Sequence, residues 1–286
     1  MIWVIFSITA GFFDSVYYSV LKKLSDIDTY SKMALLNLMT LPFLAFGFLF
    51  FKIPKVPAMF YLVTLSNIVI FFLAQVLMIK SLQMSNLSVS IPMLSFSPAF
   101  LLFTSYLMLN EFPALAGLMG VLLVVAGSYI LNAGEIKKGY MEPIKSIFKN
   151  KGVFYMLIVA FLFSISANLG KMGIKLSNPA FYMFMFYFIY SLLLLVIFFN
   201  KIKSNLNSMG NNIWYFALGG FSIGASELLA GAALTSSIVP YIISLKRTSI
   251  LFSVLIGIFI FKEKNFKEAI IGSAIMFVGV LLITLS

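Results

Sequence analysis

The most constraining feature of this sequence is a series of ten long apolar runs that occupy almost the whole chain. A helix needs about 20 mainly apolar residues, at about 1.5 Å per residue, to cross the roughly 30 Å hydrocarbon core of a bilayer. Ten runs reach this length, and short polar connectors separate them. We expect an all-α integral membrane protein with transmembrane helices near residues 2–21, 33–51, 58–80, 87–109, 114–132, 152–174, 179–199, 212–234, 239–261 and 266–285.

The composition supports this fold class and excludes several kinds of site. Hydrophobic residues make up 62% of the chain and charged residues 10%, whereas a soluble domain carries roughly 25% charged residues. The net charge of +11 comes from lysines that lie mostly in the connectors, where they anchor helices to anionic headgroups, so we expect no nucleic-acid partner. The chain has no Cys and no His, which excludes thiolate or imidazole metal sites and disulfides. We expect no cofactor, because nucleotide-binding motifs are also absent.

An internal repeat appears when the sequence is shifted by 152 residues. Unlike residue types keep this one ungapped offset, which argues against coincidence among apolar helices. The matching positions are Lys23-Leu24-Ser25 with Lys175-Leu176-Ser177, Gln75 with Glu227, Glu111 with Glu263, Gly120 with Gly272, and Gly127 with Gly279.

The repeat predicts how the chain is divided. We expect a first five-helix repeat over residues 1–132, a basic connector over 133–151 and a second five-helix repeat over 152–286. Five crossings is an odd number, so the second copy must enter the membrane from the opposite side. Inverted repeats of this kind enclose a site near the bilayer midplane that each face opens in turn.

Four ionisable residues lie deep within the apolar runs: Asp14, Glu227, Lys246 and Arg247. Each costs at least about 2.5 kcal/mol near the bilayer centre, so each needs a partner or a function. Glu227 precedes the turn at 235–238 by about as many residues as Lys246 and Arg247 follow it, which places all three at a similar depth. We expect Glu227 to pair with one cation and leave the other for a ligand. The alternatives are an ion pair that only fixes helix register, or cations that extend toward the headgroups.

Further polar side chains are candidates for the same site. Asp14 shares a helical face with Tyr18 and is a candidate to take up a proton or attract a substrate amine; the alternative is a contact within or between helices. Three amides, Gln75, Asn168 and Asn37, are candidate hydrogen-bonding groups, although such residues equally often join membrane helices to one another.

The strings Leu-Asn-Glu-Phe-Pro at 109–113 and Phe-Lys-Glu-Lys-Asn at 261–265, with the glycines that follow each, carry a family resemblance. With the repeat, they make the sequence similar to the drug/metabolite transporter superfamily, specifically EamA-type carriers. The resemblance implies two five-helix repeats around a central cavity and transport of small metabolites such as amino acids. Glu111 and Glu263 are at helix ends, so we interpret them as structural.

A second, more distant resemblance concerns Lys246 and Arg247. They are similar to the basic pair in the ninth helix of plastid sugar-phosphate translocators, where the pair contacts phosphate. The surrounding spacing departs from the plastid pattern, so this similarity offers an organic-anion substrate only as a lead.

The sequence therefore predicts a gradient-driven transporter of a small polar metabolite, multi-pass in the cell membrane and monomeric or homodimeric. One alternative is a lipid-modifying membrane enzyme with Asp14 and Glu227 as acid and base, although no nucleophile or metal ligands accompany them. Another is a channel or a non-transporting membrane partner. The orientation stays open, because the resemblance places both termini in the cytoplasm and the lysine-rich connectors place them outside.

Overall fold

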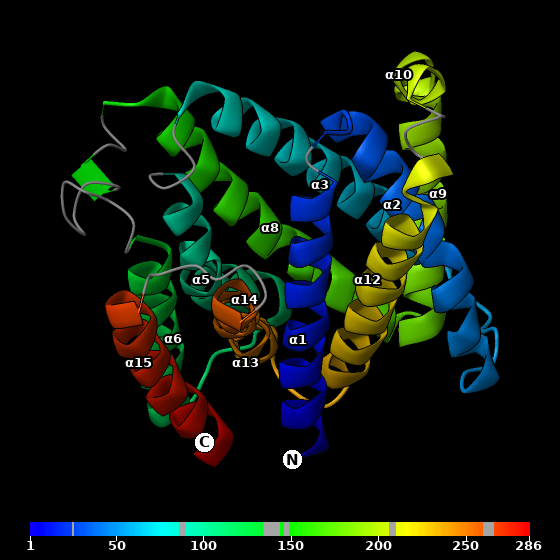
Figure 1. Ribbon diagram of the computed structural model, residues 1–286. Coiled ribbons are helices and arrows are strands. Elements are labelled where there is room, and N and C mark those ends of the chain that lie inside the picture. The colour runs from blue at the N-terminus through cyan, green and yellow to red at the C-terminus, as the bar shows by residue number, and fades with distance from the viewer. Residues whose placement is uncertain (25, 86–89, 134–143, 146–148, 206–209, 260–265) are drawn as a thin grey trace.

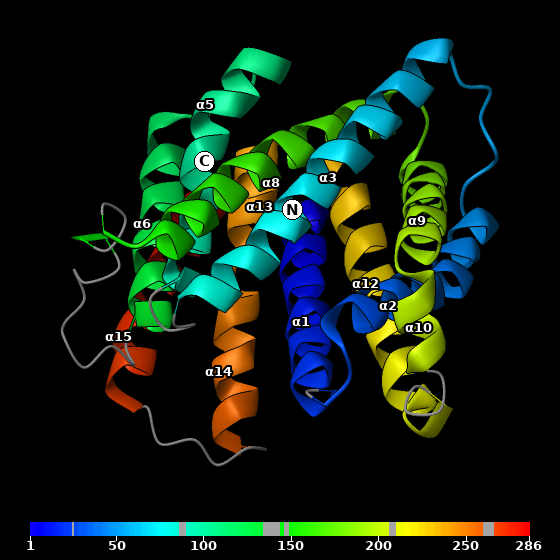
Figure 2. The same cartoon turned by 90° about the horizontal axis from the view of Figure 1, so that it is seen from above.

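The computed structural model describes residues 1–24, 26–85, 90–133, 144–145, 149–205, 210–259 and 266–286, and every regular element in these ranges is helical (Figures 1 and 2). The first half contains α1 (Ile2–Lys23), α2 (Thr29–Ala45), η1 (Phe46–Leu49), α3 (Ala58–Met84), η2 (Ile91–Phe96), α5 (Ser97–Leu109) and α6 (Leu115–Ala133). The second half contains α8 (Lys151–Lys175), α9 (Pro179–Ile197), α10 (Phe199–Ser204), α12 (Ile213–Leu234), α13 (Val239–Lys246), α14 (Ser249–Phe259) and α15 (Phe266–Leu285).

Six helical spans in the described part of the chain are long and apolar enough to cross a membrane. They are α1, α2 together with η1, α3, α8, α9 and α12. Three shorter apolar helices lie at Met93–Leu109, Leu115–Leu131 and Ile271–Leu285, within three of the other expected segments. The all-helical membrane fold is thus confirmed, and ten complete crossings stay a prediction.

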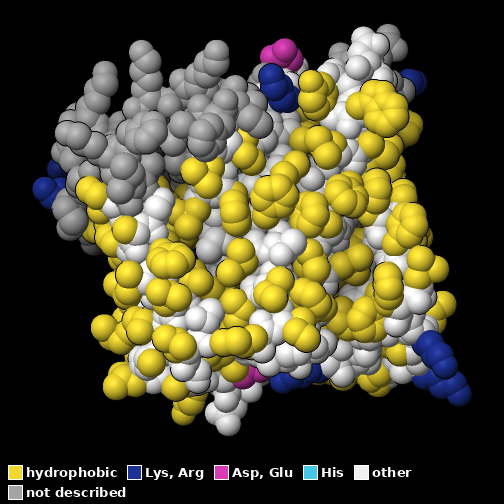
Figure 3. Space-filling view, turned by 60° about the horizontal axis from the view of Figure 1, so that its bottom comes forward, with side chains coloured by type: hydrophobic (Ala, Val, Ile, Leu, Met, Phe, Trp, Pro, Cys, Tyr) yellow, Lys and Arg dark blue, Asp and Glu magenta, His cyan; other side chains and the backbone are white. Residues whose placement is uncertain are grey.

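Large apolar side chains cover the outside of the helices. Figure 3 shows one face on which hydrophobic side chains dominate the described surface and charged ones lie near its margins. Trp214 and Phe50 are 85% and 83% exposed. A surface this apolar is stable only against lipid, so the chain is an integral membrane protein.

Polar side chains set the ends of several helices. Asp28 accepts hydrogen bonds from the backbone N–H groups of Tyr30 and Ser31 and so begins α2. Asn178 accepts from the N–H of Phe181 and begins α9 in the same way. These side chains satisfy N–H groups that have no partner within the helix. Asn110 ends α5 in a left-handed conformation, with φ of 55°.

The runs expected at 87–109 and 239–261 are each divided into two helical pieces. The first changes from η2 to α5 at Ser97, because Pro98 lacks an N–H and its ring excludes a continuous α-helix through the preceding turn. The second breaks between α13 and α14, where the Thr248 hydroxyl donates to the carbonyl of Leu245 at 2.7 Å and so competes with the helical hydrogen bonds. The pieces α5 and α14 begin at Ser97 and Ser249, which are 152 residues apart.

Helices α6 and α15 lie side by side (Figures 1 and 2) and meet through glycines. A Cβ built on Gly120 would lie 2.7 Å from the carbonyl oxygen of Gly279, and one built on Gly279 would lie 2.7 Å from that of Gly120. Gly127 and Gly272 approach each other in the same reciprocal way, at 2.7 and 2.8 Å. The two helices are therefore antiparallel and in backbone contact, which larger residues at these positions would prevent.

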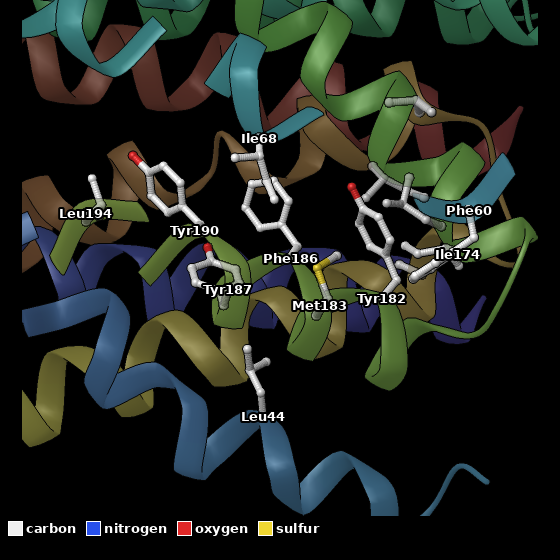
Figure 4. Close-up of a cluster of buried hydrophobic side chains, with 14 of the residues drawn as sticks. Leu44, Phe60, Ile68, Ile174, Tyr182, Met183, Phe186, Tyr187, Tyr190 and Leu194 are labelled. Carbon is white, nitrogen blue, oxygen red and sulfur yellow. The ribbon is translucent and has the colours of Figure 1, made fainter. Parts of the chain in front are cut away.

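Aromatic side chains on α9 belong to the largest cluster of buried apolar residues in the described part of the chain. The rings of Tyr182, Phe186 and Tyr190 lie along one side of α9 (Figure 4), with centroids 6.2 and 5.9 Å apart between successive rings. The Tyr182 hydroxyl accepts a hydrogen bond of 2.6 Å from the Asn67 amide on α3. This contact fixes α9 against α3, and both helices contribute to the wall of the cavity described next.

Candidate functional site

A cavity of about 540 Å³ lies between the helices, within the range of small-molecule sites. Its wall comes from both halves of the chain, including α1, α2, α3, α5, α8, α9, α12 and α13. It is lined by apolar and aromatic side chains with a small group of charged ones, so a ligand would meet few but specific polar contacts.

Three of the charged residues form one ion-pair cluster in the wall. The Lys246 ammonium lies 2.9 Å from Glu227 Oε1 and 3.5 Å from Asp14 Oδ2. Ser226 donates a hydrogen bond of 2.6 Å to the other oxygen of Asp14. The pairing of Glu227 with one of the two adjacent cations, expected from their depth, is present, and the cation is Lys246. Two carboxylates from α1 and α12 thus share a single ammonium from α13.

Arg247 is left without a carboxylate partner among the described residues. Its Nη2 donates to the hydroxyl of Ser97, and its Nε is buried with no hydrogen-bond partner. It is also the only arginine of the 286-residue sequence, in which all other basic residues are lysines. A guanidinium offers a planar fork of donors that suits carboxylate and phosphate groups, so this side chain has unused capacity for an anion.

The charges of the described cavity wall sum to +1 when all are ionised. Asp14 and Glu227 contribute two negative charges, whereas Lys32, Lys246 and Arg247 contribute three positive ones. A desolvated excess of positive charge attracts anions and dipolar ligands. The wall therefore favours a ligand that carries a negative group.

Most of the residues predicted for the site line the cavity. Tyr18, Asn37 and Gln75 do so together with the four charged residues, although Asn37 already donates to the carbonyl of Met33 at 2.6 Å within α2. Asn168 is not part of the wall. It is fully buried between α8 and α5, where it accepts from Ser105 at 2.7 Å and donates to Thr104 at 3.0 Å, so it joins these helices to each other.

Two serines that bond to charged groups of the site were not predicted, Ser97 and Ser226. Each orients one charged group, since Ser97 accepts from Arg247 and Ser226 donates to Asp14. The sequence contains many serines, and a lone one has no distinguishing pattern. The available signals were that Ser226 precedes Glu227 and that Ser97 precedes a proline.

Equivalent positions of the two halves line the same cavity. Several wall residues form pairs at the offset of 152: Asp14 with Ser166, Gln75 with Glu227, Leu94 with Lys246, and Ser97 with Ser249. The positions are shared, but the charges are not, because each of these pairs has a charge on one side at most. The cavity thus combines a repeated geometry with an asymmetric distribution of charge.

Comparisons with known proteins agree with this architecture. A family model described as the EamA-like transporter family matches residues 1–133 and again residues 150–285. A solved structure titled only "Crystal structure of protein" is similar in fold, with a TM-score of 0.77 and 13% identity over 99% of this chain and 97% of that one. No curated protein matches the chain. Because one family model matches nearly the whole sequence in two successive copies, this protein belongs to the EamA-like transporter family.

Proposed function

We propose that the protein is a secondary transporter of a small polar metabolite with an anionic group, such as an amino acid or an organic anion, in the cell membrane. The observation that carries this proposal is the guanidinium of Arg247, which has no carboxylate partner among the described residues, in the wall of a 540 Å³ cavity. A transporter family supplies the setting, and the cavity supplies a place for a solute within the protein.

The ligand's negative group binds to Arg247 in this proposal. Lys246 is already neutralised by Glu227 and Asp14, so it competes weakly for an anion. The cluster of two carboxylates and one ammonium carries an excess negative charge when ionised, which suits a ligand ammonium. An amino acid would place its carboxylate on Arg247 and its amine toward Asp14.

Transport proceeds by alternating access between two inverted five-helix repeats, residues 1–132 and 152–286, joined by the connector 133–151. Three observations support this: the family model matches twice, α6 and α15 meet antiparallel through reciprocal glycines, and the cavity wall contains pairs of positions 152 residues apart. In carriers built this way, one repeat moves against the other around a fixed site. Without a nucleotide motif, an ion or solute gradient drives the cycle, and Asp14 is the candidate proton carrier.

Ligand binding to purified protein tests the role of Arg247. Amino acids, dicarboxylates and phosphate esters would be screened by thermal shift, since a ligand at 100 times its Kd stabilises the folded state by about 2.7 kcal/mol. Arg247→Gln should abolish the shift of every ligand that the parent binds. The matched control is Lys80→Gln, which removes a cation from an exposed position on α3 and should keep the shift.

Proteoliposome uptake of the best ligand then tests transport. Arg247→Gln should abolish saturable uptake, and Lys80→Gln should not. Unchanged ligand affinity in a folded Arg247→Gln variant would remove the proposed binding site.

A further inference from the structure

A second buried ion-pair network lies outside the cavity. Lys171 on α8 is 5% exposed, and its ammonium lies 2.7 Å from Glu111 Oε1 in the connection between α5 and α6. Lys175, one turn further along α8, lies 3.5 Å from the same oxygen and is largely exposed. The proposed binding of a ligand uses none of these groups, so their burial needs another explanation.

Backbone groups of a third segment complete this network. The Lys171 ammonium donates to the carbonyl of Ser237 at 2.5 Å, and the second oxygen of Glu111 accepts from the N–H of Val239 at 3.1 Å. Ser237 and Val239 lie where α12 connects to α13. The network therefore joins the first half of the chain, through Glu111, to two separate segments of the second half.

The network is at one end of the cavity. Gly170, which precedes Lys171, lines the wall, and so does Leu234, three residues before Ser237. At this end the wall residues Tyr182 and Leu234 are buried, at 1% and 5% exposed, and the network joins the segments that cover them. The opposite end reaches Thr29, which is exposed at the start of α2.

The closed end faces the side of the molecule where both chain termini lie. Tyr241, two residues after Val239, stacks on Trp3 at the start of α1, with ring centroids 6.2 Å apart. Thr29 follows the far end of the 22-residue α1, and the termini appear together at the bottom of Figure 1. The cavity is thus closed on the terminal side and reaches an exposed residue on the other.

We propose that Glu111 and Lys171 form a latch that holds the cavity closed on the side of the chain termini, and that separation of this pair opens that side. The latch rests on the proposed function, since it assumes a cavity that opens to each face in turn. It crosses from one half of the chain to the other, so relative motion of the halves must break it. A desolvated pair is either formed or replaced by two hydrated ions, which makes it suited to a two-state transition.

Only one half of the repeat carries the lysine that the latch requires. At the offset of 152, the position of Lys171 corresponds to Ser19, whose hydroxyl donates to the carbonyl of Ser15 within α1. That position therefore carries no charge in the first half. The closed state seen here has an ion pair that the oppositely closed state cannot form at the equivalent position.

Distance measurement between spin labels tests the latch without any ligand. The chain has no native cysteine, so Ala114→Cys and Thr235→Cys, at exposed positions in the α5–α6 and α12–α13 connections, would be the only labelled sites. In nanodiscs the labelled parent should give one predominant short distance. Glu111→Gln combined with Lys171→Gln should add a longer distance and raise the ratio of long to short at least about tenfold. Both charges are removed together, so no lone buried charge threatens folding.

The control is Lys175→Gln, which removes the exposed lysine of the same network and should leave the ratio within about twofold of the parent. An unchanged short distance in the double variant would overturn the latch, and so would an equal effect of Lys175→Gln. Because this experiment contains no ligand, its failure leaves the site at Arg247 intact. Conversely, a binding test that ruled out the site at Arg247 would not change the interpretation of the measured distances.

Discussion

The two buried ion-pair networks of this protein differ in how completely their charges are satisfied. In the network of Glu111 and Lys171, the charged groups also bond to backbone N–H and C=O groups and are 12% and 6% exposed. In the cavity cluster, Glu227 and Lys246 are 26% and 15% exposed. The buried Nε of Arg247, beside them, has no hydrogen-bond partner in the part of the chain that the structure describes. A network whose charged groups are all hydrogen-bonded holds segments of the fold together, whereas a group with an unpaired donor remains available to bind a ligand.

The largest expected effect is removal of the cation that two carboxylates share. Lys246→Met leaves Asp14 and Glu227 near each other without a counter-ion, and loss of one partner of a buried pair typically costs about 3–5 kcal/mol. Thermal unfolding in detergent should show a large loss of stability. The triple variant with Asp14→Asn and Glu227→Gln added should recover most of it. If the triple variant is no more stable than the single one, the cost is one of packing and not of charge.

Lys171→Met should destabilise the protein by less, about 1–3 kcal/mol. Glu111 keeps the N–H of Val239 and the nearby ammonium of Lys175 as partners, whereas the cavity carboxylates have no second lysine in the cluster. The same unfolding measurement compares the loss of stability caused by replacing Lys171 with that caused by replacing Lys246. Equal losses for Lys171→Met and Lys246→Met would contradict the comparison between the networks.

Asn168→Leu should cost about 1–2 kcal/mol, because interhelical hydrogen bonds in membranes contribute up to roughly this amount and the fully buried amide bonds to Thr104 and Ser105. Chemical unfolding of the purified variant measures it. The Ser105→Ala variant, which removes only one of the partners of Asn168, should lose less of the free energy of unfolding. A neutral Asn168→Leu would show that α5 and α8 are held together by apolar packing alone.

The smallest effect on stability is expected for Arg247→Gln, within about 1 kcal/mol of the parent. Among the described residues, the guanidinium makes one hydrogen bond to Ser97, and its buried Nε has no partner. Its removal should therefore change the free energy of unfolding only slightly. The same variant should lose ligand binding, and this separation of stability from binding identifies a ligand contact. A loss of stability as large as that of Lys246→Met would make Arg247 a structural residue instead.

The sequence predicted those features that depend on local pattern. Apolar runs predicted membrane-spanning helices, and equal distances from one turn predicted that Glu227 pairs with one of two adjacent cations, which the structure shows to be Lys246. Contacts between residues far apart in the sequence could not be predicted. Glu111 was interpreted as structural from its place at a helix end, but nothing in the sequence indicates Lys171, 60 residues later, as its partner.

Two further features could not be predicted for physical reasons. An amide in a membrane helix can face a cavity or a neighbouring helix with the same sequence pattern, so Asn168 could not be distinguished from Gln75. The break between α13 and α14 contains no proline or glycine and depends on a threonine hydroxyl that bonds to its own backbone.

The reciprocal glycine contacts of α6 and α15 make this seam self-complementary. Each helix meets a partner with the same glycine spacing, which is the arrangement that joins the subunits of an isologous dimer. The two halves of a single chain thus meet at this seam as two identical subunits would, although their charged residues differ.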